Sequence, residues 1–227
     1  MLKRIFWATL STGVLCTFAL AAVSPAVGKF LESWNAETNI GIFDSVKALY
    51  VLIPLAVAVV SRVFLLHDRI SDLLGLRRRF DIENILKPLA EGVGLPTTDA
   101  NWKQIEENRD LAMTRTFYRY ASFRDPKIDG QLVRSAADRW AWFWCTIEPQ
   151  IILVITGVIF VTLGAWTQLL GLLAIMWGLI LISLLLWPML RAGARSQTGE
   201  ILNSDSWKIE VRSAFVHLGG QALGSEK

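Results

Sequence analysis

The sharpest cluster of charged side chains in this sequence of 227 residues is the run Arg77-Arg78-Arg79. A guanidinium group is planar and donates two parallel hydrogen bonds to a phosphate or carboxylate. The run therefore predicts an anion site, for the headgroups of anionic lipids or for a phosphorylated ligand. The alternative interpretation is structural, because the same charges would orient the chain in a membrane and form salt bridges to Asp72, Asp81 or Glu83.

Other residue types that carry chemistry are present, but not in a catalytic pattern. The sequence has two histidines and two cysteines, which are His67, His217, Cys16 and Cys145. Acidic side chains at Asp68, Asp72, Glu106, Glu107 and Asp110 have the spacing of solvated helix faces. We find no metal-ligand spacing, no nucleophile with a base and no glycine-rich phosphate loop. We therefore expect a protein that is not an enzyme and that uses no metal and no cofactor.

Glu148 is an acid of a different kind, because it stands beside Pro149 where the chain approaches an apolar segment. We expect its side chain to cap a helix or to pair with Arg139. No Asp or Glu lies within the four apolar segments as we delimit them below. Ion-coupled transporters usually carry ionisable groups at membrane depth, so this absence argues against coupled transport.

Four strongly apolar segments must position these residues, and they cover 5–23, 46–66, 151–166 and 169–190. Each is close to the ~20 residues that a helix needs to cross a hydrocarbon core of ~30 Å. A single helix over 151–190 would be ~60 Å long, so the chain must turn back, and Trp166-Thr167-Gln168 is the best turn. The sequence thus predicts an all-α integral membrane protein with four transmembrane helices and a helical cytoplasmic insert between the second and third.

The predicted division of the chain has four parts. Residues 1–66 hold the first transmembrane helix pair with a short outer loop, 67–150 form the helical insert, 151–190 form the second transmembrane hairpin, and 191–227 are a tail. The first apolar run is longer than the ~7–15 residues of a cleaved signal peptide, so we expect a retained anchor. The insert contains 13 Lys/Arg and 13 Asp/Glu. This balance gives no basic field for phosphates, so we expect no specific nucleic-acid binding.

The distribution of basic residues predicts the orientation. Lys3 and Arg4 precede the first segment, Arg62 and Arg69 flank the end of the second, and Arg191 follows the fourth. An excess of Lys and Arg marks the cytoplasmic side of a bacterial inner membrane. Both termini and the insert are therefore expected in the cytoplasm, which agrees with an even number of spans.

Tryptophans and prolines complete the set of candidate sites. Tryptophan favours the headgroup layer, where its ring is buried and its N–H stays wet. Interfacial anchors are predicted at Trp7, Trp140, Trp144, Trp166 and Trp187. Pro54 and Pro149 are candidate hinges, because proline removes one backbone donor from a helix; a static kink is the alternative.

The order of spans, insert and tail resembles the small four-span membrane effectors of bacterial anti-phage defence systems. This resemblance implies that the cytoplasmic part senses infection or another signal, and that the bundle then oligomerises and breaks membrane integrity. On this basis we expect an inner-membrane sensor-effector that forms a homo-oligomer in the lipid bilayer. The alternative is a non-conducting anchor or accessory subunit that recruits a soluble cytoplasmic protein through the insert.

Overall fold

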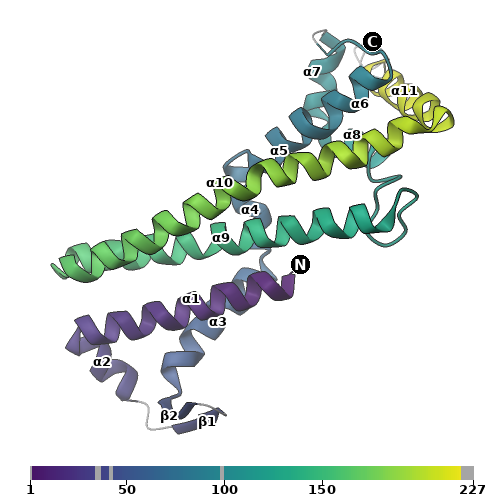
Figure 1. Ribbon diagram of the computed structural model, residues 1–227. Helices are drawn as coiled ribbons and strands as arrows, with labels where there is room; N and C mark the ends of the chain where they lie inside the picture. Colours follow the sequence, from purple (N-terminus) through teal and green to yellow (C-terminus); the bar gives the residue numbers. More distant parts are fainter. Residues whose placement is uncertain (1, 34–36, 41–42, 98–99, 221–227) are drawn as a thin grey trace, which may run out of the picture. The chain divides into compact units, whose positions relative to one another are not determined.

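A computed structural model describes residues 2–33, 37–40, 43–97 and 100–220 (Figure 1). In chain order its elements are α1 (Leu2–Val23), α2 (Pro25–Glu32), β1 (Glu37–Ile40), β2 (Phe43–Lys47), α3 (Leu49–Val63), α4 (Leu66–Leu73), α5 (Leu76–Asp81), the π-helix η1 (Ile82–Leu86), α6 (Lys87–Gly92), α7 (Ala100–Glu107), α8 (Arg109–Thr116), α9 (Gly130–Thr162), α10 (Trp166–Asn203) and α11 (Asp205–Gly220). The chain is predominantly helical, as the apolar periodicity predicts.

The chain divides into two compact units, and the division differs from the four predicted parts. The membrane-type unit consists of 1–67 and 140–187, and the helical unit consists of 68–139 and 188–227. Residues 68–139 of the predicted insert thus belong to one unit with the tail, although they are far apart in the sequence, whereas residues 140–150 belong to the membrane-type unit. Residues 221–227 of the predicted tail lie outside the described residues.

Among the described residues, three helices are long and apolar enough to cross a membrane, and they cover Lys3–Val23, Gly130–Thr162 and Trp166–Asn203. A fourth crossing is reached only if α3 and α4 count as one span, because the pair is bent by 64°. The break lies at Phe64 and Leu65, where Leu65 has a positive φ of 46°. The large bend of the predicted second span therefore comes after α3 ends and not at the candidate hinge Pro54.

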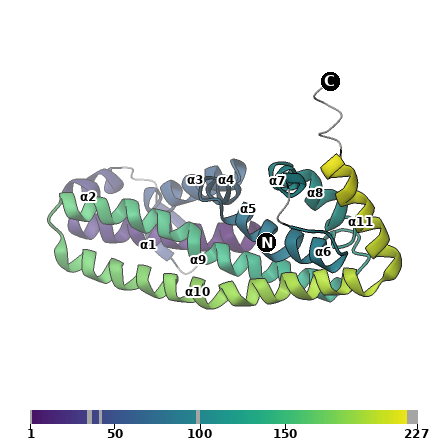
Figure 2. The same cartoon turned by 90° about the horizontal axis from the view of Figure 1, so that it is seen from above.

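The other predicted helix boundaries also differ from those in the structure. Helix α9 continues through Pro149, and α10 continues through Pro188 to Asn203 without a break at the predicted start of the tail. The turn between α9 and α10 lies just before the predicted one. It contains Gly164, whose φ of 67° favours glycine, and α10 already begins at Trp166. The two helices run side by side in both views (Figure 1, Figure 2).

The predicted outer loop contains regular structure that the sequence analysis did not anticipate. Ser24 caps α2 by accepting a hydrogen bond from the Val27 N–H at 3.4 Å, and Pro25 occupies the first turn. The strands β1 and β2 then form an antiparallel hairpin in which Glu37 pairs with Lys47. Strands this short leave no alternating pattern to read. Residues 34–36 and 41–42 of this loop lie outside the described residues.

Each unit has its own core. In the membrane-type unit, Cys16 of α1 packs with residues of α9, α10 and the turn between them, which are Leu153, Phe160, Ala165 and Leu172. Helices α1 and α3 approach closely at Gly13, where an added Cβ would lie 3.0 Å from the Pro54 Cβ. In the helical unit, α11 packs against α6, α7 and α8. Its buried Val211 and Phe215 belong to the same hydrophobic interior as Met113.

Candidate functional site: a buried carboxylate in the membrane-type unit

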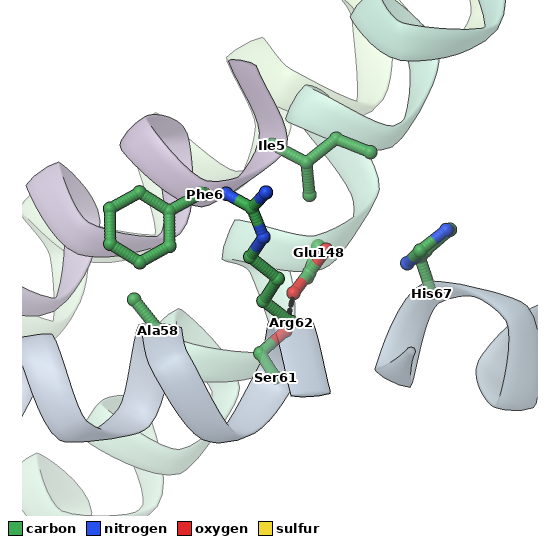
Figure 3. Close-up of a pocket in the computed structure, with 7 residues that line it drawn as sticks. All are labelled: Ile5, Phe6, Ala58, Ser61, Arg62, His67 and Glu148. Atoms are coloured by element: carbon green, nitrogen blue, oxygen red, sulfur yellow. Dashed lines mark hydrogen bonds between the residues drawn. The ribbon is translucent and has the colours of Figure 1, made fainter. Parts of the chain in front are cut away.

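A small cavity with both apolar and polar lining lies among α1, α3, α9 and the start of α4 (Figure 3). Its lining residues are Ile5, Phe6, Ala58, Ser61, Arg62, His67 and Glu148. Ser61 and Arg62 come from the last turn of α3, and Glu148 comes from α9. Four polar side chains thus face one cavity in a unit that is otherwise rich in apolar helix surface.

Glu148 is the centre of this cavity. Its side chain belongs to a residue that is only 2% exposed, and the Ser61 hydroxyl donates a hydrogen bond to Oε1. The second oxygen, Oε2, is buried and has no hydrogen-bond partner among the described residues. Leaving a buried polar atom unpaired costs about 1–3 kcal/mol, more if it is charged. Because the buried Glu148 carboxyl group destabilises the fold in this arrangement, it is a candidate functional group.

This geometry corrects two expectations from the sequence. Glu148 is bonded to Ser61 and not to Arg139, whose Nη1 donates to the Met189 carbonyl oxygen at 3.0 Å in the other unit. The apolar segment 151–166 contains no acid, but the uninterrupted helix α9 that includes it also contains Glu148. The predicted boundary between residues 150 and 151 placed Glu148 outside this helix, which continues through Pro149.

Aromatic and basic side chains border the cavity. The ring of His67 contacts Trp144 edge-on, with centroids 6.0 Å apart. Trp144 is buried, so it does not serve as the predicted interfacial anchor. Its neighbour Trp142 is exposed instead, and the Arg4 guanidinium lies 5.7 Å from its ring centroid. A cation over an indole face is a favourable contact and holds the start of α1 against α9.

The remaining predicted anchors divide into two groups. Trp7 and Trp166 are exposed, as an interfacial anchor requires. Trp140 and Trp187 are half-buried, and each packs against the ring of Phe143 at 5.7 and 5.6 Å, respectively.

The cavity can support a contact that responds to charge, but its composition does not suit a metal. Among the residues that the structure describes, no group of three or more His, Cys, Asp and Glu side chains could hold a metal ion. One carboxyl group, one hydroxyl, one imidazole and one guanidinium can instead exchange hydrogen bonds or form an ion pair. Such an exchange would alter the contact between α3 and α9, because Glu148 and Ser61 are on different helices.

The predicted arginine site lies in the helical unit, and the structure does not keep its three residues together. Arg77 is half-buried, and its Nη1 lies 3.3 Å from Asp68 Oδ1 while its Nε lies 4.0 Å from Asp81 Oδ2. Arg78 and Arg79 are exposed, and Arg79 pairs with Glu83 at 3.1 Å. The salt bridges to Asp81 and Glu83 that the structural interpretation of the arginine run predicts are therefore present in the structure.

Asp81 is buried at the start of the π-helix η1 and does not cap a helix through its side chain. Arg109 Nη1 lies 3.5 Å from its Oδ2. Burial raises the pKa of Asp81 to about 6, against the lowering effect of Arg109 and Arg77. Burial and the Asp81 charge also raise the pKa of Tyr118, which is hydrogen-bonded to Arg77. A buried carboxyl that titrates near neutral pH is an unusual feature of the helical unit.

The sequence signals for these contacts are weak. Ser61 is one of many serines, and nothing in its spacing links it to Glu148 across 87 residues. Arg109 likewise gave no signal, because its partner Asp81 belongs to a separate helix. Only Glu148 itself, an acid at the edge of an apolar run, pointed to the site.

Comparison with known proteins gives one match to a family. The model of the YmfE protein family matches residues 1–217. No curated protein and no solved structure matches the chain.

Proposed function

We propose a function for this chain, which belongs to the YmfE protein family: it is a bacterial inner-membrane sensor-effector in which cytoplasmic helices control a membrane bundle. The bundle would contain four spans, with α3 and α4 counted as one bent span. Both termini and the helical unit would face the cytoplasm. The assembly would be a homo-oligomer within the lipid bilayer.

The observation that carries the proposal is that α9 and α10 each contribute residues to both units. Within the helical unit, hydrogen bonds connect residues of the insert at the start of α9 with residues at the end of α10. Gln197 donates to the Leu132 carbonyl oxygen at 3.1 Å, and the Asp129 N–H donates to Glu200 at 2.8 Å. A signal that rearranged the helical unit would therefore act directly on two of the membrane helices.

The apolar surface of the membrane-type unit supports insertion into lipid. Large apolar side chains on α10 are exposed, including Leu170, Ile175, Leu181 and Leu185. In water such a continuous apolar surface would be unfavourable, whereas in a bilayer it faces acyl chains. Arg4 and Arg62 belong to the helix ends that the positive-inside rule assigns to the cytoplasm.

The role in anti-phage defence is part of the proposal and comes from the layout of spans and insert. In this interpretation, infection changes the helical unit, and the bundle then loses its barrier function. The contact between Ser61 and Glu148 is the place in the bundle where such a change would break a polar contact. A specific polar contact is better suited to a switch than uniform apolar packing.

A variant that weakens the contact between the insert and the tail tests whether this contact controls the bundle. Tyr120 donates to Glu210 Oε2 at 2.7 Å, and Arg119 Nη2 lies 2.9 Å from the same oxygen. Glu210→Ala removes both contacts from α11. Lys208→Ala is the matched control, because Lys208 lies on the same helix and pairs with the exposed Asp205 of that helix at 3.3 Å.

The experiment is regulated expression in bacteria, with and without phage challenge, while membrane potential and dye entry are followed. The proposal predicts depolarisation on challenge for the natural chain and for Lys208→Ala, with a several-fold weaker response for Glu210→Ala at equal membrane abundance. The rival function is that of a non-conducting anchor. It is supported if the potential stays intact under every condition, while a soluble protein co-purifies and is lost on deletion of residues 68–139.

A further inference from the structure

In the short helix α4, two polar residues are buried and the last leucine is exposed, while Arg69 and Asp72 of the same helix are exposed as well. His67 and Ser71 are buried, and the Ser71 hydroxyl has no hydrogen-bond partner among the described residues. Leu73 and Leu74, at the end of α4 and in the turn after it, are 86% and 60% exposed. Transfer free energies favour the opposite placement, with leucine inside and serine outside. The arrangement fits a helix whose outer side meets an apolar medium.

Two exposed arginines follow these leucines closely. Gly75, with a φ of 64°, turns the chain between α4 and α5. Arg78 and Arg79 then stand on the exposed surface of α5, where 77% of the Arg79 side chain is accessible. Asp72 and Glu83 carry nearby negative charge, and Glu83 is the partner of Arg79. Apolar side chains beside guanidinium groups form the pattern of a surface that meets acyl chains and phosphates together.

The position of α4 in the chain indicates which apolar medium its exposed leucines meet. Helix α3 ends at Val63, and the exposed residues Val63, Phe64 and Leu65 continue its apolar surface to the start of α4. Residues 63 and 73 are ten positions apart, so their Cα atoms are at most ~35 Å from each other even in a fully extended chain. If α3 belongs to a membrane span, Leu73 cannot lie far from the bilayer surface.

We propose that α4 and the turn after it lie in the cytoplasmic interface of the bilayer. Leu73 and Leu74 insert among the acyl chains, and Arg78 and Arg79 bind the phosphates of anionic phospholipids. This inference rests on the proposed membrane insertion. It divides the arginine run by function, since Arg77 is held by Asp68 and Asp81 and does not contact lipid.

The test measures how deeply position 73 lies in lipid. The full chain without its natural cysteines (Cys16→Ala, Cys145→Ala) receives one spin label through Leu73→Cys, Phe123→Cys or Leu181→Cys. Phe123 is an exposed apolar residue of the helical unit, and Leu181 is an exposed residue of α10. Each protein is placed in nanodiscs of neutral lipid or of neutral lipid with phosphatidylglycerol. Accessibility to oxygen and to a water-soluble nickel chelate is then compared.

We expect the label at position 73 to favour oxygen over nickel by several-fold, as the label at 181 does, whereas the label at 123 favours nickel. Arg78→Glu with Arg79→Glu should shift the label at 73 towards water in anionic discs, and Arg78→Lys with Arg79→Lys should shift it less. If the labels at 73 and 123 are equally accessible to nickel in both lipids, the inference is wrong. A label at 181 that is also open to nickel would instead contradict the membrane insertion itself.

Discussion

At the scale of single residues, Asp81 combines deep burial with two guanidinium partners, and burial prevails. Its pKa rises from 3.8 to about 6. Between these values the folded chain holds a proton that the unfolded chain has released. The stabilisation is therefore complete below about pH 4 and is lost as the pH rises through about 6. The shift corresponds to about 3 kcal/mol at 1.36 kcal/mol for each unit of pKa.

Asp81→Asn should remove this dependence. We expect the variant to show a flatter decline in unfolding free energy between pH 4 and 6 than the natural chain, because the amide does not titrate. The measurement is denaturant unfolding of the detergent-solubilised protein across that range. Asp205→Asn is the control, since the Asp205 side chain is 95% exposed. Equal slopes for the natural chain and Asp81→Asn would contradict the assignment.

Ser61 and Glu148 give the second prediction at this scale. Ser61→Ala leaves the buried Glu148 without its hydrogen-bond partner, so the free energy of unfolding should fall by about 1–3 kcal/mol. Glu148→Gln in the Ser61→Ala background should cost less than in the natural chain, because the two residues share one interaction. Thermal unfolding of the four proteins of this cycle measures the coupling. Additive effects would show that the contact between α3 and α9 is not formed.

At the scale of elements, the close approach of α1 and α3 in the membrane-type unit can be tested at Gly13. A Cβ there would lie 3.0 Å from the Pro54 Cβ, so Gly13→Leu must push α1 away from α3. Overpacking of this kind costs about 1–3 kcal/mol. Gly178→Leu is the matched control, because nothing lies within 4 Å of the Cβ position at Gly178. Thermal stability in detergent should fall for Gly13→Leu only, and an equal fall in both would refute this packing.

The sequence predicts most of the helices but not all of their ends. Glycine favours helix ends, and α6 does end at Gly92, just before Gly94 with its positive φ of 73°. Proline was a poorer guide, because Pro149 and Pro188 both lie inside continuous helices. Proline removes one backbone donor, and packing on neighbouring helices can offset that loss. The break at Leu65 had no such signal, since leucine rarely adopts a positive φ.

At the scale of the whole molecule, the main feature that the sequence did not predict is the joining of insert and tail. Local periodicity identifies an amphipathic helix near Trp207 and Phe215 but does not name the surface that covers it. That surface is formed by α6, α7 and α8, which are about a hundred residues away in the sequence. The same limit applies to the candidate site, where Glu148 was noticed and Ser61 was not.

The central claim is a four-span chain whose helical unit and termini share the cytoplasmic side, and labelling of single cysteines tests it most directly. The natural cysteines are replaced, and Gln168→Cys or Ser206→Cys is introduced at an exposed position. Intact bacteria are then treated with a thiol reagent that does not cross the membrane. The account predicts labelling at position 168 in intact cells and at position 206 only after permeabilisation. Labelling of position 206 in intact cells, with position 168 protected, would contradict it.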